Sequence, residues 1–331
     1  MTWEEYRKTL IVSNMRVVLT EKCQADCPHC FNSMYRKTDD IDDKKLFEFF
    51  QKNLGKLPVH FQAMGGEPTL HPNFKSIIQG SLKYFQFARV FTNGLDMRIV
   101  EDCVHPVTRI GWIFNGLTAQ PKKLHELFKK APCRMIFYVV YRPETSKKML
   151  EKIKTIVSLF KPGEISITLS ADTTNPGFFQ KEFFKKGSLQ EYRKGFVAFL
   201  KEAFIAGSGG YVNPTLDHSL PTCFFDDIEI SDVYEQAGIS YNANCKRCPS
   251  RLIKTDFGVY YCNQVNIKVC DLFEDGKPVT IDHIEKMTDG TVRKRAELME
   301  VKHCEGCKVK KLCLGGCSFN ALMRLENKDG F

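Results

Sequence analysis

The sequence predicts an α/β fold in which six successive strand–helix units build a parallel sheet. Short runs rich in Val, Ile, Phe and Thr alternate with amphipathic stretches of about 10 to 15 residues. Such units place their strands side by side in parallel, and reactive residues then follow the strand ends. With 331 residues the chain is long enough for this domain and for a smaller second one.

The alternating pattern places each element in order along the chain. Strands are expected at 15–20, 59–64, 88–92, 109–115, 135–141 and 165–170. Helices are expected at 42–54, 73–85, 96–103, 121–130, 144–160 and 189–206. From Gly207 the stretch GSGGYVNPTLDHSLP has the composition of a linker, and the cysteine density then rises. We therefore place a domain boundary near residue 220, which gives domains 1–220 and 221–331.

Composition argues against several classes of protein. The formal charge of +9 counts every cysteine as neutral, and metal-bound thiolates would lower it. The lysines are spread along helical stretches such as PKKLHELFKK, which is typical of a solvated face and not of a nucleic-acid surface. No run of about 18 apolar residues predicts a membrane span. The beginning of the chain lacks the apolar region of a signal peptide, so we expect a cytoplasmic protein whose 14 cysteines are reduced.

The stretch CQADCPHC places three cysteines just after the first strand. Cys23, Cys27 and Cys30 have no fourth cysteine nearby to complete a four-coordinate site. Three thiolates at this spacing predict a metal centre with one open position. A zinc site that takes His29 as its fourth ligand is the alternative.

Two further motifs follow the next two strands. MGGEP, at 64–68, offers Gly65 and Gly66 for close approach of a ligand to the backbone, and Glu67 offers a carboxylate to an amino group. The two glycines could instead form an ordinary turn. FTNG, at 91–94, follows the third strand.

These motifs, in this order on these strands, resemble the radical S-adenosylmethionine (radical SAM) enzymes. The resemblance implies a partial (β/α)6 TIM-like barrel whose three cysteines hold a 4Fe-4S cluster. The amino and carboxylate groups of S-adenosylmethionine would occupy the open iron. Asn115, after the fourth strand, would bind the ribose, and Arg142, after the fifth, would bind the methionine carboxylate with its bidentate fork, although either could be an ordinary loop residue. The cofactor-binding residues implied are Gly65, Gly66, Glu67, Pro68, Thr92, Asn93, Asn115 and Arg142.

The C-terminal cysteines resemble a SPASM domain, an appendage of radical SAM enzymes that holds one or two auxiliary 4Fe-4S clusters. CEGCKVKKLCLGGC, at 304–317, resembles its second half, and CKRCPSRLIKTDFGVYYC, at 245–262, its first. Eight cysteines would suffice for two clusters. The resemblance groups Cys245, Cys248, Cys262 and Cys317 in one cluster and Cys304, Cys307 and Cys313 in the other. The downstream cysteine that usually completes the second cluster is missing from this chain, so we expect Cys270 to replace it, and an open iron or a non-cysteine ligand is the alternative. Zinc bound by the CxxC pairs is the alternative.

Other residues are expected in lesser roles. Cys103 and Cys133 are interpreted as ordinary buried thiols. Cys223, near the domain boundary, is a core cysteine, a catalytic thiol that faces the active site, or an additional cluster ligand. His60 and Gln62, on the second strand, could handle protons inside the barrel.

The resemblance implies an oxidoreductase that cleaves S-adenosylmethionine reductively to a 5′-deoxyadenosyl radical. Its expected substrate is a peptide or protein side chain, which it would oxidise or crosslink, with flavodoxin or ferredoxin as reductant. Only 22 residues precede Cys23, so we expect a separate protein to bind any leader peptide. The alternatives are a dehydrogenase or epimerase of a small molecule such as an aminosugar, and a non-catalytic iron-sulfur electron carrier. An open iron argues against the carrier.

Overall fold

The strands and helices of this chain follow the predicted order. The structure is a computed structural model, and it describes residues 14–28, 30, 38–103, 109–171, 188–207, 209–212, 251–260 and 268–288. The first six strands agree with the predicted ranges to within one residue, and they are β1 (Asn14–Thr20), β2 (His60–Gly65), β3 (Phe87–Thr92), β4 (Ile110–Asn115), β5 (Arg134–Tyr141) and β6 (Ile165–Ala171).

The helices between these strands are confirmed as well. They are α2 (Asp43–Lys52), α3 (Phe74–Ser81), α4 (Met97–Cys103), α5 (Pro121–Lys130), α6 (Ser146–Leu159) and α8 (Ser188–Ala206). Only α3 departs from its predicted range by more than two residues. It ends early because Leu82 and Lys83 donate to carbonyls three residues back, which tightens the last turn. None of the described helices is both long enough and apolar enough to cross a membrane.

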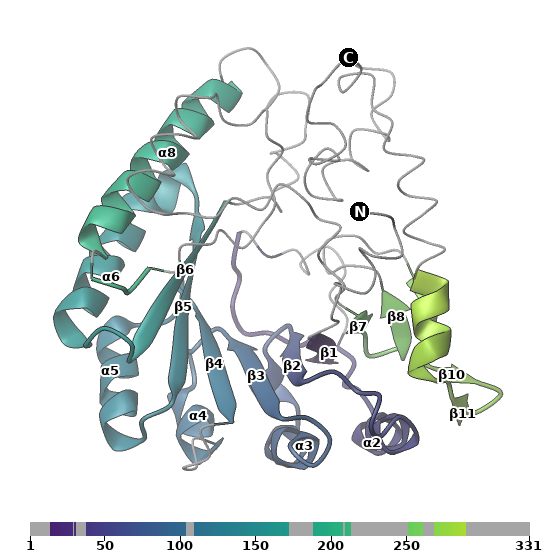
Figure 1. The fold of residues 1–331 in the computed structure, drawn as a ribbon. Coiled ribbons are helices and arrows are strands. Elements are labelled where there is room, and N and C mark those ends of the chain that lie inside the picture. Colours follow the sequence, from purple (N-terminus) through teal and green to yellow (C-terminus); the bar gives the residue numbers. More distant parts are fainter. Residues whose placement is uncertain are drawn as a thin grey trace.

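The strands form one large sheet in the order β6-β5-β4-β3-β2-β1-β7-β8-β9. Strands β1 to β6 pair in parallel with their sequence neighbours, as strand–helix units require. Their helices cover one side of the sheet in the same order, from α2 to α8 (Figure 1). This confirms the α/β class and the parallel sheet.

The hydrophobic core lies between the sheet and these helices. Trp112 of β4, Phe61 of β2, and Phe49 and Phe50 of α2 are fully buried there. The rings of Phe50 and Phe85 meet edge-on with centroids 4.9 Å apart. Each such side chain contributes about 1.5 to 3 kcal/mol by its burial, so this core fixes the positions of the strand ends.

The opposite side of the sheet, here called the open face, carries alternate residues of the same strands. The register aligns one row across β1 to β5 that is mostly polar, and it consists of Arg16, Gln62, Arg89, Gly111 and Arg134. Two residues further along the strands, Val18, Met64 and Ile113 form a buried apolar row. The polar row therefore lies near the strand starts, and the residues that follow the strand ends lie beyond the apolar row.

Three short strands extend the sheet beyond β1. They are β7 (Arg251–Ile253), β8 (Gly258–Tyr260) and β9 (Lys268–Asp271), and β7 pairs in parallel with β1. A hairpin of β10 (Phe273–Glu274) and β11 (Lys277–Pro278) and a helix at 281–288 follow. Asn53, at the end of α2, donates to the Val279 carbonyl (3.0 Å) and accepts from the Ile281 amide (2.8 Å). Described parts of the predicted second domain thus share the sheet and core of the first, and the boundary near residue 220 stays a prediction.

Candidate functional site

The loop that carries Cys23, Cys27 and Cys30 has two ends that are paired with each other. Thr20, the last residue of β1, forms an antiparallel bridge with Asp40. The Ile41 amide donates to the Leu19 carbonyl (2.8 Å), and the Glu21 amide to the Asp39 carbonyl (3.1 Å). These two paired ends, residues 19–22 and 39–41, are called the stem below. The stem fixes where the cysteine loop leaves the sheet.

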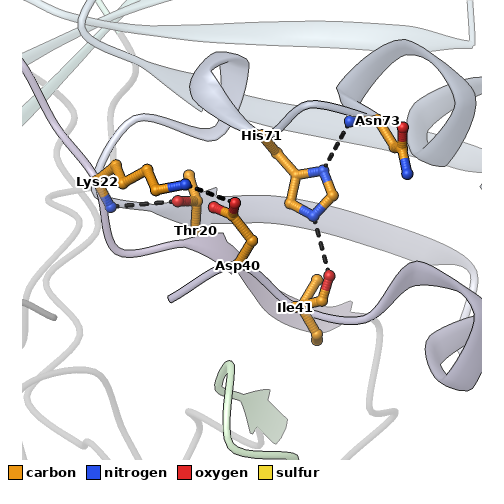
Figure 2. Close-up of polar contacts among 6 residues, drawn as sticks. All are labelled: Thr20, Lys22, Asp40, Ile41, His71 and Asn73. Atoms are coloured by element: carbon orange, nitrogen blue, oxygen red, sulfur yellow. Dashed lines mark hydrogen bonds and ion pairs between the residues drawn. The ribbon is translucent and has the colours of Figure 1, made fainter. Parts of the chain in front are cut away.

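Side chains reinforce the stem (Figure 2). The Lys22 ammonium contacts the Asp40 carboxylate at 2.6 Å, and the Lys22 amide donates to the Thr20 hydroxyl at 3.2 Å. Burial alone would raise the pKa of Asp40, but hydrogen bonds from Lys22 and Thr20 outweigh it and hold that pKa below its ordinary value. Asp40 is therefore held ionised as the partner of Lys22.

His71 connects the stem to the turn after β2. Its Nδ1 accepts from the Asn73 amide at 3.0 Å, so the ring proton lies on Nε2 and is donated to the Ile41 carbonyl, also at 3.0 Å (Figure 2). The side chain is buried. His71 thus has a positioning role that the motif analysis did not assign.

Gly65 and Gly66 allow close approach of backbone to backbone. The Gly66 amide donates to the Thr20 carbonyl (2.8 Å) and the Glu67 amide to the Lys22 carbonyl (2.7 Å). A Cβ on Gly65 would overlap the Thr20 carbonyl, and one on Gly66 would overlap the Lys22 carbonyl. The segment that approaches these glycines in the structure is the stem, and their contact with a ligand stays a prediction.

Glu67 ties the end of β2 to the end of β3. Its side chain is 0% exposed, and its two oxygens accept from the Asn93 amide (2.6 Å), the Thr92 hydroxyl (2.9 Å) and the Thr69 hydroxyl (2.7 Å). Burial raises the pKa of Glu67 although these hydrogen bonds favour the carboxylate. Pro68 is buried beside it and opens the 3-10 turn η2 (Pro68–Leu70). The structure gives Glu67 internal partners, and its predicted contact with a ligand amino group is untested.

Two asparagines at the strand ends direct their amides at the cysteine sulfurs. Asn93 Nδ2 lies 3.9 Å from Cys23 Sγ, and Asn115 Nδ2 lies 3.5 Å from Cys27 Sγ. Each Oδ1 accepts from a backbone amide two residues further on, at 2.9 Å for Asn93 and 3.0 Å for Asn115. These bonds set the orientation of each amide, so its N–H groups face the sulfur.

Lys152 of α6 holds the loop that follows β4. Lys152 is 8% exposed, and its ammonium donates to the carbonyls of Gly116 (2.8 Å), Leu117 (2.9 Å) and Ala119 (2.8 Å). Burial lowers its pKa to about 8. A signal in the sequence could have identified it, because Lys152 lies at helical spacing on the core face of α6 with Met149, Ile153 and Ile156.

Arg142 follows β5 and caps the short helix η3 (Pro143–Thr145). Its side chain is 11% exposed, and its guanidinium forms an ion pair with Glu144 at 2.5 Å. The Glu144 carboxylate therefore already lies beside the Arg142 guanidinium, and binding of a methionine carboxylate by Arg142 stays a prediction.

The remaining cysteines fall into three groups. Cys103 is buried in the core, and burial raises the pKa of the half-buried Cys133 to about 12, so both fit the description of ordinary thiols. Cys270 is half-buried on β9, and burial raises its pKa to about 11. The other predicted ligands and the catalytic candidate lie outside the described residues, and they are Cys223, Cys245, Cys248, Cys262, Cys304, Cys307, Cys313 and Cys317.

The site suits a cluster by the chemistry of its donors. Three partly exposed thiols follow β1, and amide groups from the ends of β3 and β4 face two of them. Among the described residues, no three acidic, histidine or cysteine side chains converge on a single metal ion. In a 4Fe-4S cluster each thiolate binds a different iron, and N–H groups that face the sulfurs tune its potential.

Comparison with known proteins gives a match at the level of structure only. No protein-family model matches the sequence, and no curated protein matches it either. The structure is similar to that of Streptococcus suis SuiB bound to S-adenosylmethionine, with a TM-score of 0.61 and 15% identity over 93% of this chain and 73% of that one. SuiB bound to its precursor peptide SuiA gives a TM-score of 0.60 and 15% identity, covering 96% of this chain and 75% of that one.

A second similar protein is anSMEcpe with bound AdoMet and the Cp18Cys peptide. It gives a TM-score of 0.58 and 17% identity, covering 92% of this chain and 88% of that one. At these identities the likeness establishes the fold. The chain therefore has the fold of radical SAM enzymes, as the cysteine motif and the loops at its strand ends predict.

Proposed function

We propose that this chain is a radical SAM enzyme that modifies a peptide or protein side chain by oxidation or crosslinking. The observation that carries the proposal is the position of Cys23 and Cys27, which follow β1 and face the strand-end amides of Asn93 and Asn115. A 4Fe-4S cluster on Cys23, Cys27 and Cys30 would supply the electron that cleaves S-adenosylmethionine to a 5′-deoxyadenosyl radical, which removes a substrate hydrogen atom.

The chain's own residues would position that chemistry. The stem and the Gly66 contact fix the start of the cysteine loop, while Glu67 fixes the end of β3 relative to the end of β2. Thr118 donates to the Asn93 carbonyl at 2.5 Å and so joins the loops after β3 and β4. These hydrogen bonds connect the loops that follow β1, β2, β3 and β4. The side-chain amides of Asn93 and Asn115 are therefore held in place before any cofactor binds.

The substrate class rests on the similar structures. SuiB and anSMEcpe share this fold and have peptides bound, which favours a peptide over a small molecule. We further propose a partial (β/α)6 barrel, a SPASM-like C-terminal domain with up to two auxiliary clusters, and a flavodoxin or ferredoxin as reductant. A separate leader-peptide-binding protein would present the substrate.

A triple variant tests the cluster assignment. Cys23→Ala, Cys27→Ala and Cys30→Ala together should remove about four of the roughly 12 irons bound after anaerobic reconstitution. The variant should also lose formation of 5′-deoxyadenosine from S-adenosylmethionine under a strong reductant. Cys133→Ala is the matched control, since this thiol lies away from the site, and it should keep both properties.

Two outcomes would contradict the proposal. Deoxyadenosine formation at the wild-type rate in the triple variant would show that the site is misplaced. A wild-type protein that binds iron but never cleaves S-adenosylmethionine would favour the electron carrier.

A further inference from the structure

The starts of the strands carry a second polar group on the open face. Arg89 of β3 and Arg134 of β5 lie in one row, with Gly111 of β4 between them. His60 begins β2 one row nearer the strand starts, and its ring stacks on Phe87 with centroids 5.3 Å apart. Arg89, Arg134 and the neighbouring His60 are together called the basic row below.

The basic row has no anionic partner in the part of the chain that the structure describes. Arg89 is half-buried and Arg134 is exposed, yet neither side chain forms an ion pair or hydrogen bond among these described residues. His60 Nδ1 is buried without a hydrogen-bond partner among the same residues. Burial lowers the pKa of Arg89, and the charge of Arg134 lowers it further, because the two guanidiniums repel each other. Uncompensated like charges at this proximity favour the binding of an anion.

Gly111 leaves room between the two guanidinium stems. Strands β3 and β5 lie two strand spacings apart, about 10 Å. A Cβ at Gly111 would lie 3.8 Å from the Arg134 carbonyl and 3.9 Å from Arg89 Cγ, which is ordinary contact. The space above this glycine is therefore bordered by both arginines, and it can take a small group without moving the backbone.

The basic row is separate from the cysteine site. Val18, Met64 and Ile113 form the buried apolar row between the strand starts and the strand ends. Asn93 is four residues beyond Arg89, or about 13 Å at the rise of a strand. A ligand at the basic row would therefore lie away from Asn93 and the strand ends.

We propose that Arg89, Arg134 and His60 bind a phosphate-class dianion above Gly111. Two guanidinium forks match the oxygens of a phosphate, and a dianion neutralises both arginines where a single carboxylate would neutralise one. The phosphate is either free or the terminal group of a phosphate monoester. This inference stands apart from the proposed reaction, because phosphate binding requires neither a cluster nor S-adenosylmethionine.

Calorimetric titration of the full chain with inorganic phosphate, at fixed ionic strength in chloride, tests the proposal. Arg89→Gln and Arg134→Gln should each raise the dissociation constant about tenfold or more, because each removes a charge-assisted hydrogen-bond donor. Arg98→Gln is the matched control, since Arg98 is an exposed arginine paired with Asp96 elsewhere on the surface. It should bind phosphate as the wild type does.

Gly111→Glu gives an independent test that places a carboxylate between the two arginines. It should abolish phosphate binding and raise the melting temperature in phosphate-free buffer, whereas Gly111→Ala should leave that temperature within a few degrees of wild type. Both variants should cleave S-adenosylmethionine at the wild-type rate.

Adenosine monophosphate, with adenosine as control, identifies the source of the phosphate. Tighter binding of the monoester than of inorganic phosphate would assign the site to esters, and equal binding would assign it to free phosphate. Absence of phosphate binding by the wild type, or binding that Arg89→Gln and Arg134→Gln leave unchanged, would overturn the proposal.

Discussion

The two ends of the parallel strands use polar residues in opposite ways. At the strand ends, Glu67 and Lys152 are buried ionisable groups whose polar atoms have several internal partners. At the strand starts, Arg89 and Arg134 are charges with no partner of opposite sign among the described residues. Glu67 follows β2 and Lys152 reaches the loop after β4 from α6, whereas Arg89 and Arg134 lie on β3 and β5 of the same sheet.

This difference separates positioning from binding. A buried polar group whose hydrogen bonds are all made internally holds its surroundings in one arrangement. A group of like charges without partners costs folding free energy, and a ligand can offset that cost. The strand ends are therefore expected to be sensitive to substitution, and the strand starts tolerant.

The largest difference in stability is expected between alanine substitutions of one glycine near the strand ends, Gly66, and one near the strand starts, Gly111. Gly66→Ala would drive a Cβ into the Lys22 and Glu21 carbonyls, so it should lower the free energy of unfolding by about 3 kcal/mol. Gly111→Ala meets only ordinary contacts and should change stability by about 1 kcal/mol or less, with a gain expected. Urea unfolding measures both variants. Equal losses in the two would contradict the contrast between the ends.

The buried cation Lys152 and the half-buried cation Arg89 offer the second test. Lys152 has a pKa of about 8 in the folded protein against 10.5 for the ordinary side chain, so between these pH values the unfolded chain binds more protons. Wild-type stability should therefore rise with pH in this window relative to Lys152→Met, by up to about 3 kcal/mol.

Arg89→Met is the control for this titration. Its guanidinium stays charged throughout the window, so its stability difference from wild type should not change with pH. At low ionic strength without phosphate, the substitution should not destabilise the protein, because it removes repulsion from Arg134. Unfolding free energies measured from pH 7 to 10.5 test both expectations. A stability difference between wild type and Lys152→Met that does not change with pH would refute the lowered pKa assigned to Lys152.

The smallest effect is expected at the stem. Lys22→Met removes the ion pair with Asp40, and because both side chains are partly exposed to water, the loss should be about 0 to 1 kcal/mol and decrease with added salt. Thermal unfolding at low and high salt measures it. A loss above 2 kcal/mol would mean that this pair contributes more to the stem than its backbone bonds do.

Strands β7 to β9 qualify the expected division of the chain. Composition predicts a new domain after residue 220, but β7 pairs in parallel with β1, register Met15 to Arg251. Leu252 packs with Val18 and Met64 on the open face. A linker-like composition indicates where regular secondary structure ends. It does not indicate that a later strand will pair with the β1 edge of the same sheet.

The sequence by itself determined the parallel α/β fold, because the periodicity of apolar residues is a local property. It also determined where the cysteine motif and the GGEP and FTNG motifs lie relative to the strands. Only the tertiary structure decided what those residues contact. Gly66 faces the stem, Glu67 faces Thr92 and Asn93, and Asn115 faces Cys27, because the sheet aligns strand ends that are distant in sequence.

The same reason explains the residues that motif analysis did not find. Lys152 reaches its three carbonyls from a helix about 35 residues further along the chain, and Arg89 and Arg134 share a row only through the pairing of β3, β4 and β5. A motif shows which groups are available over a few residues. The long-range register decides which of these groups meet and which charges remain without partners, because pairing between strands depends on the packing of the whole sheet and not on local sequence.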